Sequence, residues 1–125
     1  MKYDRLTTLS TVAEAVFQRE HQKLRPLLQR EAQILRQLSR LEAQSMDMKS
    51  ASAGTDGYQI TGADLVWHSW EEATRRKLNI ELARLRSQKL AAMESLRGAF
   101  GRKQAVSELA RRLHADRRRV VQSKP

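Results

Sequence analysis

Two long segments with helical periodicity, at residues ~4–47 and ~63–118, are separated by one short polar loop at ~48–62. The loop holds three of the five glycines, and the flanking segments are rich in Ala, Leu, Arg, Gln and Glu, which are good helix formers. Because each segment can turn only one apolar row toward the other, the core is thin. We therefore expect an all-α chain, an elongated two-helix antiparallel coiled-coil hairpin. It forms a single domain over residues 1–125 that closes with a short disordered C-terminal tail.

Apolar residues recur at helical spacing in both segments, mostly in steps of three, four or seven. In the first segment they are Leu6, Leu9, Ala13, Val16, Leu24, Leu27, Ile34, Leu38, Leu41 and Met48. In the second they are Trp67, Trp70, Leu78, Leu82, Leu85, Met93, Leu96, Phe100, Leu109 and Leu113. Steps of 11 from Leu82 to Met93 and from Leu85 to Leu96 predict a nearly straight or slightly right-handed pair. Glu20 and Glu31 interrupt the first row. Such residues can fix the register of the two helices or face a partner, but we favour the interpretation that both are exposed.

Pro26 interrupts the first segment, where it removes the hydrogen bond to the carbonyl of Gln22. Two outcomes are open, one kinked helix or two helices that meet near Arg25. Apolar spacing resumes directly at Leu27 and no Gly or Asn marks a turn, which favours a first helix kinked at Pro26.

Sequence signals also mark the ends of the helices. A capping-box pattern at Thr11–Glu14 leaves the first turn at either Asp4 or Thr11, and Thr61–Asp64 is expected to open the second helix. Gly98 and Gly101 lie inside the second segment, where they permit close approach of the first helix or of a partner, or create a soft point.

Catalytic and metal-binding signatures are missing from the sequence. There is no cysteine, no phosphate-binding, dinucleotide-binding or zinc-protease motif, and the three histidines are far apart. His68 and Glu72 share a helical face, but two ligands without a third are better explained as a solvated pair. We expect no enzyme activity, no cofactor and no metal. Without a signal-peptide pattern or a long apolar run, we expect a cytoplasmic protein that reaches the membrane only through partners.

The net charge of +10 is uneven, since the last 25 residues hold eight Lys/Arg against two Asp/Glu. This cluster is either a solvated helix end or a docking site for an acidic protein surface, a nucleic acid or anionic lipid. We favour the protein surface, because nucleic-acid binding usually adds a recognisable motif or an aromatic platform. The candidate binding residues are Arg111, Arg112, Arg117, Arg118 and Arg119.

Trp67 and Trp70 are the only tryptophans and lie beside the loop, with Tyr58 close in sequence. One interpretation is that they fill the tip of the hairpin, and the other is that they face a partner. The first is favoured, and both hold together if the cluster is only half covered. Tyr58, Trp67 and Trp70 are therefore a second candidate partner site.

Several features together resemble the FliJ/YscO family, the small stalk proteins of bacterial flagellar and related type III export machines. These are Tyr3, Leu6 and Leu9 at the start, a first helix of forty-odd residues, a short tip loop, and a longer second helix with an arginine-rich end. The resemblance covers nearly the whole chain as a pattern of architecture and charge.

The resemblance implies a non-enzymatic component of a flagellar or type III protein export apparatus. Its basic helix ends would bind the export ATPase ring, and the tip around Tyr58, Trp67 and Trp70 would meet the membrane export gate or substrate chaperones. The alternatives are a basic helical protein associated with nucleic acid or the ribosome, or a generic coiled-coil scaffold.

Overall fold

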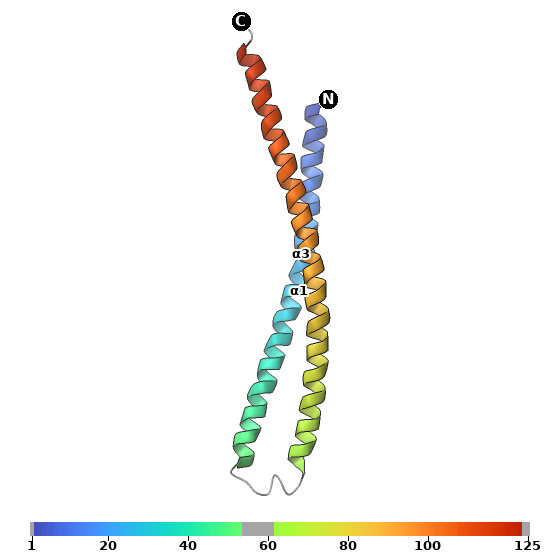
Figure 1. The fold of residues 1–125 in the computed structure, drawn as a ribbon, viewed down its shortest axis with the longest axis vertical. Coiled ribbons are helices and arrows are strands. Elements are labelled where there is room, and N and C mark those ends of the chain that lie inside the picture. The colour runs from blue at the N-terminus through green and yellow to red at the C-terminus, as the bar shows by residue number, and fades with distance from the viewer. Residues whose placement is uncertain (1, 54–61, 124–125) are drawn as a thin grey trace. The chain divides into compact units, whose positions relative to one another are not determined.

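The computed structural model describes residues 2–53 and 62–123, and these form two helices. Helix α1 spans Lys2–Ala53 and helix α3 spans Ala63–Ser123 (Figure 1). No strand occurs among these residues, and the predicted all-α two-helix hairpin is confirmed.

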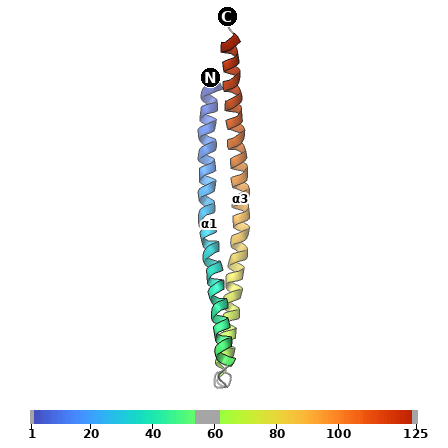
Figure 2. The ribbon, with the colours of Figure 1, turned by 90° about the vertical axis from the view of Figure 1, so that its left-hand side faces the viewer.

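The helices pack in two units. The first unit joins residues 1–26 to residues 90–125, and the second comprises residues 27–89. In each unit the segments of α1 and α3 lie side by side and run antiparallel (Figures 1 and 2).

Helix α1 is longer than predicted at both ends. Thr11 is not an N-cap, because its hydroxyl donates to the Thr7 carbonyl at 3.0 Å inside a helix that already begins at Lys2. At the other end α1 continues to Ala53, into the segment assigned to the loop, because Ala and Ser between 49 and 53 do not oppose a helix.

Pro26 lies inside a continuous α1, so the alternative of two separate helices is wrong. The proline ring is exposed, and the division between the two units falls directly after it.

Helix α3 begins after Gly62, which has a φ of 70° that only glycine adopts easily. The amides of Leu65 and Val66 donate to the Gly62 carbonyl at 3.1 and 3.3 Å, which starts the helix. Thr61, the other half of the predicted capping box, lies outside the described residues. Helix α3 runs to Ser123, past the predicted end near 118, so the expected tail is helical as far as Ser123.

The interior of each unit follows a repeat of seven. On α1 the covered positions are 13, 20, 27, 34, 41 and 48 with 17, 24, 31, 38 and 45 between them. On α3 they are 78, 85, 92, 99, 106 and 113 with 82, 89, 96, 103 and 110. Of the two predicted steps of 11, the one from Leu82 to Met93 is wrong, since Met93 is 39% exposed and the covered row passes through Ala92 and Leu96 instead. The step from Leu85 to Leu96 does join two covered residues.

The best-covered apolar cluster belongs to the second unit. Ile34 is fully buried, Leu82 and Leu85 are 8% exposed, and Leu27, Leu38 and Leu78 pack around them. In the first unit the most deeply buried side chain is the small Ala99, and Phe17 packs on Phe100 with ring centroids 6.0 Å apart. Several predicted core residues are instead substantially exposed, among them Leu9, Trp70, Phe100 and Leu109.

Candidate protein-binding surfaces

The five arginines at the end of α3 form the basic end, defined here as Arg111, Arg112, Arg117, Arg118 and Arg119. All five lie on one continuous stretch of helix in the first unit, and all are exposed. Helix continuity therefore places the five predicted residues within about two and a half turns of one another.

One carboxylate offsets part of this charge. Glu108 accepts from Arg111 Nη2 at 2.7 Å and from Arg112 Nε at 3.3 Å. The hydrogen bond from Arg111 lowers the pKa of Glu108, and the same bond raises the pKa of Arg111. Both arginine side chains remain more than 70% exposed, so these pairs leave them accessible to a partner.

The last turns of α3 extend beyond the described part of α1. Glu14 of α1 pairs with Lys103 of α3, and Phe17 packs on Phe100. In this alignment the residue numbers of two facing positions add up to about 117. The same register sets Lys2 opposite about residue 115, and residues 116–123 pass the first described residue of α1.

The basic end also has an apolar component, which the charge pattern of the sequence did not reveal. Val120 and Val121 are 56% and 69% exposed, and Val121 lines a shallow hollow with His114, Arg117 and Arg118. Exposed valines between arginines on one helix suit a protein surface that is acidic and partly apolar.

The two tryptophans contact each other in the second unit, with ring centroids 5.0 Å apart and ring planes tilted by 36°. Trp67 is half-buried, whereas Trp70 is 50% exposed and borders a groove with Leu41, Lys77 and Leu78. Tyr58, the third member of the predicted aromatic site, lies outside the described residues. The pair therefore combines one half-buried ring, Trp67, with one accessible ring, Trp70, so the two tryptophans are only half covered.

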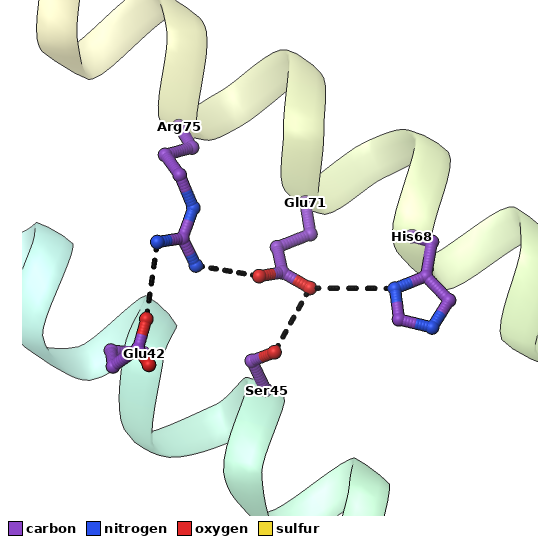
Figure 3. A network of polar contacts seen from close by, with 5 residues as sticks. All are labelled: Glu42, Ser45, His68, Glu71 and Arg75. Carbon is purple, nitrogen blue, oxygen red and sulfur yellow. Dashed lines mark hydrogen bonds and ion pairs between the residues drawn. The ribbon is translucent and has the colours of Figure 1, made fainter.

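A polar network ties the helices together in the second unit (Figure 3). Glu71 is 7% exposed; its Oε1 accepts from Arg75 at 2.6 Å and its Oε2 accepts from the hydroxyl of Ser45 at 3.1 Å. Arg75 also reaches Glu42 across the interface at 3.1 Å. Burial acts to raise the pKa of Glu71, but the bonds from Arg75 and Ser45 outweigh it and lower the pKa.

His68 belongs to this network. Its Nδ1 lies 3.8 Å from Glu71 Oε2, one residue before the Glu72 considered from the sequence (Figure 3). Within residues 2–53 and 62–123 no group of three or more His, Asp or Glu side chains is placed to hold a metal ion.

The interpretation of Glu20 and Glu31 as exposed is wrong. Their side chains are only 12% and 14% exposed, because both occupy positions of the seven-residue repeat that face α3. Glu31 accepts from Lys89 at 3.0 Å and from Arg86 at 3.3 Å, and the bond from Lys89 lowers its pKa. Spacing could have revealed both residues, since Glu20 follows Ala13 by seven and Glu31 follows Leu24 by seven.

Neither described helix contains a stretch long and apolar enough to cross a membrane. No protein-family model matches this chain, and neither a curated protein nor a solved structure shows significant similarity to it.

Proposed function

We propose that the chain is a non-enzymatic component of a flagellar or type III protein export apparatus. In this role it binds an acidic surface of the export ATPase ring through the basic end of α3. The observation that carries the proposal is the set of five exposed arginines, three of which, Arg117, Arg118 and Arg119, lie on turns of α3 that reach past the described part of α1.

The charge distribution supports the proposal. Residues 1–26 and 90–125, which make up the first unit, contain 14 Lys/Arg and six Asp/Glu, for a net +8 of the total +10. A field of this size speeds encounter with an acidic partner. Dipole compensation at a helix C-terminus is met by one or two cations, so it does not account for five arginines.

A protein partner is favoured over a nucleic acid at this end. Residues 101–123 contain no Phe, Tyr or Trp on which a base could stack, and Trp67 and Trp70 belong to the other unit. The tryptophan site remains our candidate for the export gate or a chaperone.

The test replaces the five arginines of the basic end with Ser and measures binding to purified export ATPase by titration calorimetry. We expect association to be abolished while circular dichroism still shows a helical chain, because the replaced side chains make no core contact. A matched control changes Arg36, Arg40, Arg76, Lys77 and Arg84 to Ser. It removes the same charge from exposed positions of the second unit.

Three outcomes would contradict the proposal. The first is wild-type affinity in the folded five-serine variant, and the second is an equal loss in the control. The third is tighter binding to RNA than to the ATPase, measured at the same salt concentration.

A further inference from the structure

A groove runs along one side of the α1–α3 pair in the first unit. It encloses about 280 Å³ and is lined almost entirely by carbon, with side chains from both helices. The residues that shape it are Leu9, Val12, Val16, Ala99, Arg102 and Ala105.

The groove exists because small side chains stand where larger ones would fill the interface. Ala99 is 1% exposed and forms part of the floor, and Ala105 leaves the α3 side open. Across from them Leu9 and Val12 are 55% and 54% exposed, which is high for two aliphatic residues on one face. An apolar side chain presented by a third helix would cover both residues and enter the space between the alanines.

The groove has a basic border. Arg102 is its only charged lining residue, and it forms no ion pair with the described part of the chain. On α1, Arg5 and Arg19 lie seven residues before and after Val12, so they share its face; on α3, Arg112 lies seven after Ala105. Arg19 and Arg112 have neighbouring carboxylates in Glu20 and Glu108.

From the apolar floor and the basic border we infer that this groove binds an acidic amphipathic helix of a partner protein. The apolar row of that helix would lie on Leu9, Val12 and Ala105, and an Asp or Glu beside the row would pair with Arg102.

Charge and shape favour this occupant over others. A second copy of the chain would bring another first unit with a net charge of +8. A nucleic acid would set phosphates against an apolar lining, and a bilayer meets protruding apolar residues better than a recess between two helices.

The probe is a fluorescein-labelled helical peptide with Leu at i, i+3, i+4 and i+7 and Glu at the flanking positions. Its comparison peptide carries Lys in place of each Glu. Anisotropy titrations with the full chain should show saturable binding of the Glu peptide and not of the Lys peptide, because only the former complements Arg102.

Two variants test the groove itself, each with a matched control on α3. Arg102→Glu and Ala105→Trp should each weaken peptide binding by about tenfold or more, through charge reversal and filling of the groove respectively. Arg97→Glu makes the same charge change where Arg97 pairs only with Glu94, and Gln104→Trp adds the same ring at a neighbouring exposed position. Both controls should bind as the wild type does.

The inference goes beyond the proposed function and fails separately from it. Changing Arg117, Arg118 and Arg119 to Ser should weaken ATPase binding but leave peptide affinity within about threefold. The inference is overturned if that triple variant alone releases the peptide, if the groove variants bind as the wild type does, or if the Lys peptide binds equally. It is also overturned if the chain binds phosphatidylserine vesicles but not the Glu peptide, and the groove variants abolish that vesicle binding.

Discussion

Glu31 faces the interior of the second unit, where an apolar residue would be expected. It is held by Lys89 and Arg86 from the other helix, so its charge is satisfied without leaving the interface. Replacing one partner of such a pair leaves the other charge partly buried and unpaired, which destabilises a fold.

The lowered pKa of Glu31 makes a prediction about acid stability. A carboxyl with a folded-state pKa below its ordinary value of 4.5 contributes stability that is present above about pH 4.5 and lost as pH falls through the lowered value. We therefore expect the thermal midpoint of the wild type to be level near neutral pH and to fall below about pH 4.5.

The matched variants are Glu31→Gln and Glu94→Gln, followed by thermal melts between about pH 7 and pH 3. Glu31→Gln should melt lower at neutral pH and show a shallower acid loss, since it has no carboxylate to protonate there. Glu94 is exposed and pairs with Arg97 on its own helix, so Glu94→Gln should follow the wild type. Parallel curves for all three proteins would show that the cross-helix pairs of Glu31 do not stabilise the fold.

For single residues, burial was predicted from hydropathy, which works for apolar side chains and fails for charged ones. Hydropathy predicted the burial of Ile34, Leu41, Leu82 and Leu85 correctly. It could not place Glu20 or Glu31 inside, because burial of a carboxylate depends on nearby cations: Arg19 and Lys23 of the same helix pair with Glu20, and Lys89, more than fifty positions away on α3, pairs with Glu31.

At the scale of helices, local rules predicted where the two segments lie but not how far they extend. Helix α3 begins at the predicted position because Gly62 adopts the left-handed conformation there. Ala and Ser between 49 and 53 do not oppose a helix, so α1 continues to Ala53; the capping pattern at Thr11 had no effect on a turn that was already helical.

The two internal glycines of α3 do not serve a close approach of α1. A side chain at Gly101 would meet nothing nearby, and one at Gly98 would make only an ordinary contact with Arg102. Close approach of α1 is therefore excluded, and close approach of a partner or a soft point in α3 stays open.

Pro26 leads to a prediction about the stability of α1. Because the helix continues through it, the proline removes one backbone hydrogen bond without ending the element. We expect Pro26→Ala to raise the free energy of unfolding by up to about 3 kcal/mol, measured by urea denaturation.

Gln29→Ala is the control, since Gln29 is exposed on the next turn and reports only the gain in helix propensity from alanine. An equal change in both variants would mean that the helix already accommodates the proline without cost.

At the scale of the whole molecule, the two units differ in net charge. The first unit carries a net +8, so residues 27–89 carry the remaining +2. Like charges of this density disfavour self-association at low salt, where screening is weak.

We therefore expect sedimentation velocity at about 20 mM salt to show a monomer over a wide range of protein concentration. Raising the salt to about 500 mM screens the repulsion and is the control for association through exposed apolar residues such as Leu90 and Leu109. A stable dimer at low salt would support the alternative of a generic coiled-coil scaffold.

The interior ion pairs also determine which alignments of the two helices are permitted. If α3 slid by one repeat of seven, Leu82 would take the place of Lys89 beside Glu31, and Leu96 would replace Lys103 beside Glu14. An interface lined only by leucine would tolerate that slip, whereas here it would place the largely covered carboxylate of Glu31 against hydrocarbon and leave Glu14 without its cation across the interface. The charged residues that thin the core therefore favour this alignment of α1 against α3 over one shifted by a repeat of seven.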